Sequence, residues 1–358
     1  MISTDVIIVG KGIAGLVLSS LLTQKGISNV VLHRQGRESD FALAETLPPS
    51  ALPLLQKLGL LPLFENTALQ KTYGYHSVWG RPAVVDNNFF SHRPYQYGLK
   101  INKQAIIHEL ESQQKGYIID FGKELTIQQK EGGIEVVTEN SGEPITINGK
   151  LIVDATGRKR AVLSKMGVAA EEHDSLIAFS CHVPFVKHPK LVHTVFIETF
   201  REGWGIVSRL DDARNVMTLF TRADSTVQGQ LKYYEQWYEV LEDTLYLKDF
   251  LVPATDIKVK GSKANSSKAQ TISGKNWLAV GDAAISFDPL SSHGITNAMF
   301  TVERATEAIV QHIRHDNEAA LKEYEHTLAQ IFQHYLKTKD HLYNMERRWP
   351  EASFWNIS

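Results

Sequence analysis

Three short runs of apolar residues, and a stretch of apolar residues at helical spacing between the first two, predict the first elements of the fold. Residues 6–9, 29–32 and 277–280 are almost continuously apolar. Runs of this length without polar alternation are typical of parallel strands that are buried on both faces. Between the first two runs, apolar residues recur at helical spacing from Ile13 to Leu21. The pattern predicts a βαβ unit over the first 35 residues and an α/β fold.

The remaining pattern predicts strand-rich material followed by two long helices. Apolar residues three or four positions apart predict one helix from about residue 294 and another over residues 318–338. The intervening chain is expected to form a short helix over 50–59, a helix over 102–114, strands over 117–139 and 144–153, and strands over 174–260 interrupted by one helix over 224–240.

Composition narrows the class of protein. The chain has 358 residues, which suits roughly two domains. Its 38 basic and 40 acidic residues give a net charge of −2, which excludes a nucleic-acid binder that relies on bulk positive charge. Cys181 is the single cysteine, so neither an internal disulfide nor a cysteine-rich metal site is expected. Without an apolar membrane span or a secretory leader pattern, we expect a cytoplasmic protein with no membrane partner.

A glycine motif lies between the first strand and the first helix. Gly10 permits a tight turn, Gly12 lets a pyrophosphate approach the backbone, and Gly15 lets the helix pack closely on the strand. Phosphates bind well to the free N–H groups at the start of a helix. The motif predicts a dinucleotide site whose cradle consists of Gly10, Gly12, Ile13, Ala14 and Gly15.

The end of the second strand departs from the usual dinucleotide pattern. Many such folds place a carboxylate there to bind the ribose hydroxyls. This chain has His33 and Arg34 instead. A neutral imidazole can hydrogen-bond one hydroxyl, and a surface histidine without a ligand is the alternative interpretation.

Two later segments favour FAD among the dinucleotides. Asp154 and Gly157 follow an apolar strand and resemble the Asp-Gly motif of flavoprotein hydroxylases. Gly281 and Asp282 follow another and resemble the Gly-Asp motif, whose aspartate binds the ribityl chain in those proteins. Parallel sheets bind ligands at these strand ends. Capping of a turn or a helix is the alternative role for either aspartate.

The segment before the long helix predicts a site for the flavin ring. A loop that leads into a helix N-terminus directs backbone N–H groups outward and stabilises negative charge, which reduced flavin carries at its pyrimidine edge. The residues expected to contact the ring are Pro289, Ser291, Ser292, Gly294 and Ile295.

Together these motifs resemble the superfamily of flavin-dependent halogenases and monooxygenases with the p-hydroxybenzoate hydroxylase-type fold. Residues 44–50, 75–80, 288–292 and 346–355 are similar to one branch, the LodB/GoxB-like flavoproteins and the related QhpG enzymes. The resemblance implies an FAD-binding Rossmann-type domain, an inserted strand-rich substrate domain and C-terminal helices. The implied boundaries are 1–70, 96–170 and 271–315 for the first domain, 71–95 and 171–270 for the second, and 316–358 for the helical segment.

The resemblance also assigns residues to the site. It places Glu45 beside the flavin, and Lys103 stands where relatives carry an arginine. His76, Trp79, Trp204 and His293 are candidates to line a cavity above the flavin, although packing roles remain open for each of them. Halogenases carry a Trp-x-Trp-x-Ile-Pro segment, of which this chain keeps one tryptophan, and Lys71 is expected to be a surface lysine and not a halogenation relay.

The function that the resemblance implies is an FAD-dependent monooxygenase. Its substrate would be a tryptophan of a partner protein, the precursor of a tryptophylquinone amino-acid oxidase, during cysteine tryptophylquinone biogenesis. Oxygen would be the oxidant, and electrons would come from transiently bound NAD(P)H or from a reductase. The alternatives are a flavin-dependent indole halogenase, a prenyl-lipid reductase and a non-catalytic FAD-binding maturation chaperone.

Overall fold

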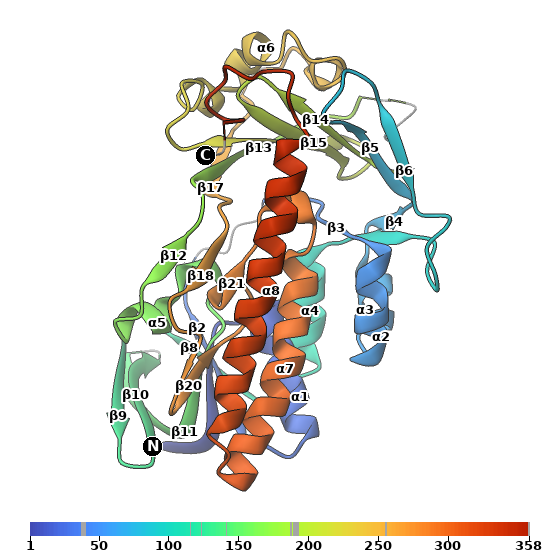
Figure 1. Ribbon diagram of the computed structural model, residues 1–358. Helices are drawn as coiled ribbons and strands as arrows, with labels where there is room; N and C mark the ends of the chain where they lie inside the picture. Colours follow the sequence, from blue (N-terminus) through green and yellow to red (C-terminus); the bar gives the residue numbers. More distant parts are fainter. Residues whose placement is uncertain are drawn as a thin grey trace.

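The computed structural model describes residues 1–36, 41–114, 116–122, 124–140, 142–186, 188, 193–254 and 256–356. The last two residues of the expected C-terminal segment lie outside this description. In the described part, an eight-stranded main sheet and a seven-stranded sheet lie at opposite ends, and two smaller sheets lie between them (Figure 1).

The main sheet contains the predicted βαβ unit. Its central order is β19-β20-β11-β1-β2-β8, and the pairings from β20 to β8 are parallel. The β9-β10 hairpin is added to this sheet by antiparallel pairing of β10 with β11. The strands are β1 (Ile2–Val9), β2 (Asn29–Arg34), β8 (Tyr117–Phe121), β9 (Leu125–Lys130), β10 (Gly133–Asn140), β11 (Glu143–Asp154), β19 (Ser273–Gly274) and β20 (Trp277–Ala279). Three strands far apart in sequence, β1, β11 and β20, thus end at one edge.

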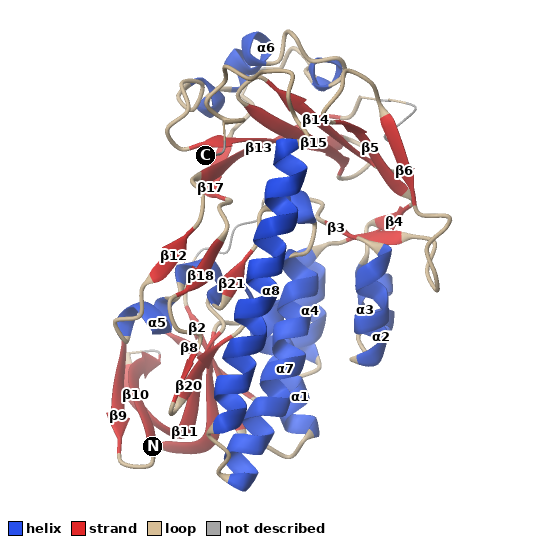
Figure 2. Cartoon of the chain, viewed as in Figure 1, coloured by secondary structure: helices blue, strands red, loops and turns tan. Residues whose placement is uncertain are grey.

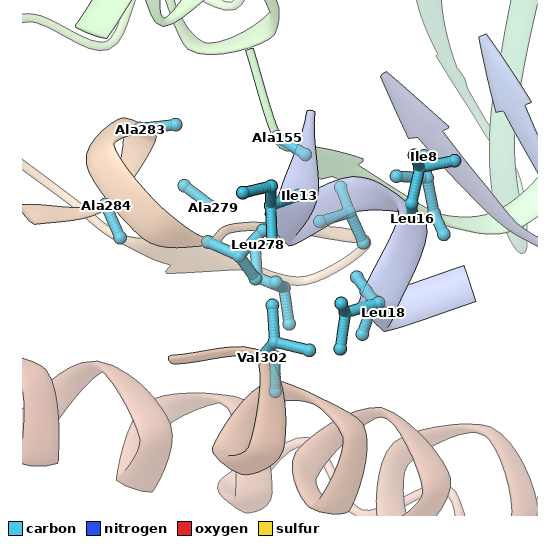
Figure 3. Packing of buried hydrophobic residues seen from close by; sticks show 14 of the residues in the cluster. Ile8, Ile13, Leu16, Leu18, Ala155, Leu278, Ala279, Ala283, Ala284 and Val302 are labelled. Atoms are coloured by element: carbon cyan, nitrogen blue, oxygen red, sulfur yellow. The ribbon is translucent and has the colours of Figure 1, made fainter. Parts of the chain in front are cut away.

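Helices cover one face of the main sheet, where α1, α7 and α8 run side by side (Figure 2). Their apolar stripes bury the contact, as in the packing of Ile13, Leu278 and Val302 from three segments (Figure 3). The helices are α1 (Ile13–Gln24), α2 (Leu52–Lys57), α3 (Leu61–Thr67), α4 (Lys103–Ser112), α5 (Ala161–Lys165), α6 (Trp237–Val240), α7 (Gly294–His315) and α8 (Ala319–Asn344). The predicted long helices are therefore present, and the second is longer than expected.

The seven-stranded sheet has the order β17-β13-β16-β15-β14-β5-β6. Its strands are β5 (Gly74–Val78), β6 (Val85–Asn88), β13 (Leu176–Pro184), β14 (Val195–Phe200), β15 (Gly203–Arg209), β16 (Arg214–Arg222) and β17 (Lys260–Lys263). The smaller sheets join the two ends and contain β3 (Thr46–Leu47), β4 (Gln70–Thr72) and β7 (Gly98–Lys100), and β12 (Ala170–Glu172), β18 (Ser267–Ala269) and β21 (Ile285–Ser286).

The helix predicted over residues 224–240 is wrong. The chain there forms short 3₁₀ turns over Gln230–Lys232 and Tyr234–Gln236, and only α6 is α-helical. Its buried residues Leu231, Tyr234 and Trp237 are spaced by three positions. This spacing matches the three residues per turn of a 3₁₀ helix, so the same apolar pattern is buried without a continuous α-helix.

Candidate functional site

The glycine turn combines two crowded positions with one open position. A Cβ atom at Gly10 would lie 2.3 Å from the carbonyl oxygen of Ala155, and one at Gly15 would lie 1.9 Å from the carbonyl oxygen of Gly10. A Cβ at Gly12 would meet no atom within 4 Å. The turn therefore packs tightly on β11 while space remains above Gly12, directly before α1. Because the first N–H groups of α1 have no partner within the helix, this open cradle fits the phosphates of FAD.

Asp154 ends β11 and is fully buried. Its carboxylate accepts hydrogen bonds from the backbone N–H groups of Thr156, Val162 and Leu163 at 2.9–3.0 Å. These contacts hold the turn after β11 and the start of α5. They are the contacts expected if Asp154 caps a turn or helix, which was the alternative role considered from the sequence. The cofactor role of Asp154 and the neighbouring Gly157 stays a prediction.

The Gly281–Asp282 turn lies at the end of β20. Gly281 has a φ of 58° and donates its N–H to the hydroxyl of Thr301 on α7 at 2.8 Å. The Asp282 side chain is 36% exposed and lies 3.7 Å from the guanidinium of Arg158. Arg158 also donates to the carbonyl of Phe287 at 2.8 Å. Asp282 thus keeps an accessible carboxylate, as a ligand for a ribityl hydroxyl requires.

Asp288, directly before the predicted flavin loop (residues 289–295), holds this loop through hydrogen bonds. This buried carboxylate accepts from the backbone N–H of Leu290 at 2.8 Å and from the Tyr343 hydroxyl at 2.6 Å. Burial raises the pKa of Asp288 to about 6, and the hydrogen bond from Tyr343 opposes the rise. Ser292 has a φ of 50°, which turns the chain into α7. Pro289 and Gly294 are exposed, whereas Ile295 is buried in the helix packing.

The other predicted cofactor residues lie at the ends of four strands and helices. His33 is half-buried in register with Asp120 of β8, and Arg34 after it is exposed. Glu45 is half-buried directly before β3, and its carbonyl accepts from Ile101 at 2.9 Å. Lys103 is exposed at the start of α4. Ile13 and Ala14 begin α1. Their contacts with FAD stay predictions.

The structure brings two of the four predicted catalytic residues into contact. The rings of Trp79 and Trp204 lie 6.1 Å apart. Trp204 donates to the Tyr343 hydroxyl at 2.9 Å and Trp79 to the carbonyl of Leu342 at 2.8 Å. Both tryptophans also pack with the C-terminal segment, where Trp355 lies 5.7 Å from Trp79. These are contacts of an aromatic core.

The two predicted histidines lie apart from that core. His76 contacts the carboxylate of Asp86 across the β5-β6 hairpin. His293 comes directly before α7, and its backbone N–H donates to the Ser291 hydroxyl at 3.2 Å. Desolvation lowers the pKa of His293, and a separate hydrogen bond between its imidazole and the backbone of Ser291 opposes this shift. His293 therefore lies within the predicted flavin loop, and its proton-handling role stays a prediction.

Sequence reasoning missed Lys100, which is fully buried on β7. Its Nζ donates to the carbonyl of Thr194 at 3.2 Å, and burial lowers the pKa of Lys100 to about 7, with a smaller contribution from Arg209. The available signal was its position between the apolar residues Leu99 and Ile101. Lys71 of the neighbouring strand β4 is paired with Leu99, the residue before Lys100, and is exposed as predicted.

A cavity of about 500 Å³ lies between α8 and the start of β13. Asp174 and Lys339 form an ion pair in its wall at 2.7 Å, and Asp288 and Tyr343 also line it. The cavity therefore reaches the groups that hold the flavin loop. In the described ranges no group of three acidic, histidine or cysteine side chains could hold a metal ion. No helix of the described chain has both the length and the apolar character needed to cross a bilayer.

The chain is similar along its length to known flavoproteins. The family described as an FAD binding domain matches residues 3–338. LodB of Marinomonas mediterranea, to which FAD-dependent oxidoreductase activity is attributed, is 29% identical over 367 residues that cover 99% of this chain and 96% of LodB. The resemblance inferred from the motifs is thereby confirmed.

Two solved structures share the fold. The flavin-dependent halogenase CmlS superposes with a TM-score of 0.83 and 21% identity, covering 99% of this chain and 67% of CmlS. QhpG, described as a peptidyl tryptophan dihydroxylase essential for tryptophylquinone cofactor biogenesis, superposes with a TM-score of 0.78 and 17% identity, covering 99% of this chain and 78% of QhpG. The predicted fold class is confirmed. The chain therefore belongs to the FAD binding domain family and is a flavin-dependent oxidoreductase related to LodB.

Proposed function

We propose that this flavoprotein is a monooxygenase that hydroxylates a tryptophan of a partner precursor protein during cysteine tryptophylquinone biogenesis. The observation that carries the proposal is the similarity to LodB over 99% of the chain, together with a fold shared with QhpG. The name of QhpG specifies a peptidyl tryptophan as its substrate. The open position at Gly12, the accessible Asp282 and the helix start after Ser292 agree with bound FAD.

The cofactor supplies the oxygen chemistry, and the protein supplies binding and electrostatics. In the net reaction, one oxygen atom of O2 enters the ring and the other leaves as water, with two electrons from NAD(P)H or a reductase. The start of α1 binds the phosphates, and Asp282 holds the ribityl chain. The N–H groups at the start of α7 stabilise negative charge on the flavin ring, and His293 exchanges protons at its imidazole.

The division of the chain follows from the same proposal. Residues 1–70, 96–170 and 271–315 bind FAD, and residues 71–95 and 171–270 receive the substrate. The main sheet and the seven-stranded sheet lie largely in these respective parts. A polypeptide substrate must reach the flavin from outside, so the approach lies along the boundary of the two parts.

Co-expression with the precursor tests the proposal. We expect the intact mass of the precursor to increase by one or two oxygen atoms in the presence of the wild-type protein, and peptide mapping to place the gain on tryptophan. Asp282→Ala should reduce the gain because it removes the accessible carboxylate. Asp224→Ala, an exposed aspartate at the end of β16, is the matched control and should leave the gain unchanged. An unmodified precursor would instead indicate a maturation chaperone.

Halogenation is the second candidate function, favoured by the fold shared with CmlS. The chain keeps Trp204 but not the Trp-x-Trp-x-Ile-Pro segment, and Lys71 lies on the surface over the ring of Tyr97. Incubation with free indole, reduced flavin and bromide distinguishes the two functions. A brominated product would support halogenation, and its absence together with oxygen on the precursor would support hydroxylation.

A further inference from the structure

Four aromatic residues near the β4-β7 pair form a strip in which Phe90 is exposed and the three tyrosines are half-buried. We define it as Tyr73, Phe90, Tyr95 and Tyr97. The rings of Tyr73 and Phe90 lie 6.2 Å apart, and those of Tyr95 and Tyr97 lie 5.9 Å apart. Phe90 is 60% exposed. A large aromatic ring with this exposure, grouped with others, is typical of an interaction surface.

The strip is bordered by cations. The Nζ atom of Lys71 lies 3.8 Å from the ring centroid of Tyr97, and Arg93 donates to the carbonyl of Phe90 at 3.0 Å. Both side chains are exposed, and neither forms an ion pair within the described residues. The nearby carboxylate of Glu65 accepts from the Tyr97 hydroxyl. With two cations and one carboxylate, the border carries an excess of positive charge that an acidic ligand would complement.

The strip is linked to a buried pair of rings through the backbone N–H of Phe89, which donates to the carbonyl of Tyr73 at 2.8 Å. Phe89, next to Phe90, is buried and lies 5.3 Å from Tyr75. The Tyr75 hydroxyl is buried without a hydrogen bond of normal geometry among the described residues. Burial raises the pKa of Tyr75, and the Ser292 side chain opposes that rise. Tyr75 therefore lies against the loop that we assign to the flavin. The strip lies at the outer end of the contacts that run through Phe89 and Tyr75 to this loop.

We propose that the aromatic strip docks a segment of the partner precursor that carries acidic and apolar side chains. The inference rests on the proposed function, because it supplies the surface that a protein substrate needs beside the flavin loop. Apolar side chains of the segment would pack on Phe90 and Tyr73. Its carboxylates would pair with Lys71 and Arg93. Exposed ion pairs contribute little affinity and mainly guide association, so Phe90 should dominate the affinity.

Fluorescent peptides test the docking surface with the full-length, FAD-loaded protein. One peptide has glutamates flanking a Trp-Leu pair, and two matched peptides carry lysines or glutamines in place of the glutamates. We expect the acidic peptide to bind most tightly in a polarisation assay. Phe90→Ala should weaken this binding about tenfold, and Arg93→Glu should weaken it and remove most of its salt dependence. The control variants Tyr117→Ala and Lys275→Glu, both exposed on other faces, should bind as the wild type does.

Several outcomes would contradict the proposed docking role of the strip. These are no binding of the acidic peptide at millimolar concentration, equal binding of the lysine peptide, or unchanged binding by Phe90→Ala and Arg93→Glu. A wild-type dimer that Phe90→Ala dissociates in sedimentation would instead assign the strip to a second copy of the chain. FAD content and oxygen transfer to the precursor are measured separately. Binding at the strip without oxygen transfer would defeat the proposed function alone, and transfer independent of Phe90 would defeat the docking surface alone.

Discussion

Replacing Gly12 by alanine separates the stability of the glycine turn from its binding role. Gly12 has a φ of −79° and a ψ of 177°, which alanine adopts without strain, and its Cβ would meet no protein atom within 4 Å. The folded apoprotein therefore accepts the methyl group. Because alanine restricts the unfolded chain, we expect the free energy of unfolding to stay equal or rise by about 0.4–1 kcal/mol.

The same methyl group would occupy space that we assign to the FAD phosphates. Forcing a methyl into a packed contact costs about 1–3 kcal/mol, which corresponds to a roughly 5- to 150-fold weaker Kd. Titration of the apoprotein with FAD, followed by quenching of flavin fluorescence, measures this loss. Urea denaturation of the apoprotein measures stability.

Two further glycines provide the contrasts. Gly229 is exposed, has a φ of −64° and also has open space at its Cβ, so Gly229→Ala should leave the FAD affinity unchanged and, like Gly12→Ala, leave the free energy of unfolding equal or slightly higher. Gly15→Ala should reduce both stability and FAD affinity, because its Cβ would lie 1.9 Å from the carbonyl oxygen of Gly10. Wild-type FAD affinity in Gly12→Ala would refute the placement of the phosphates over this turn.

Two other predictions concern buried polar groups. Tyr343→Phe leaves Asp288 and the Nε1 of Trp204 without their shared partner. It should therefore lower the free energy of unfolding, measured by urea denaturation, by about 1–3 kcal/mol. The control Tyr117→Phe, at an exposed ring, should change this free energy by less than about 0.5 kcal/mol. Burial lowers the pKa of Lys100 from 10.5 to about 7, so the folded state binds fewer protons between these values and wild-type stability rises with pH there. Lys100→Met removes this rise. The free energy of unfolding of the variant minus that of the wild type should therefore decrease by up to about 1.4 kcal/mol per pH unit above about pH 7. A difference that is independent of pH would contradict the lowered pKa.

The sequence by itself determined the local elements and the type of cofactor. The apolar runs at 6–9 and 277–280 became β1 and β20, and the glycines between β1 and α1 form the expected turn. These features depend on neighbouring residues, because strand and helix periodicity and the geometry of glycine act over a few positions. The motif order was sufficient to identify an FAD-binding fold, which the family match over residues 3–338 confirms.

Only the tertiary structure decided how distant side chains are used. Trp204 contacts Tyr343, 139 positions later, and Lys100 is buried against Thr194, 94 positions later. The position of Asp154 at a strand end predicts a cofactor ligand, but its carboxylate accepts hydrogen bonds from N–H groups that follow in the chain. Periodicity tells which face of an element is buried but not which element covers it. The partners of Trp204, Lys100 and Asp154, and hence their exposure and charge, follow from the folded contacts.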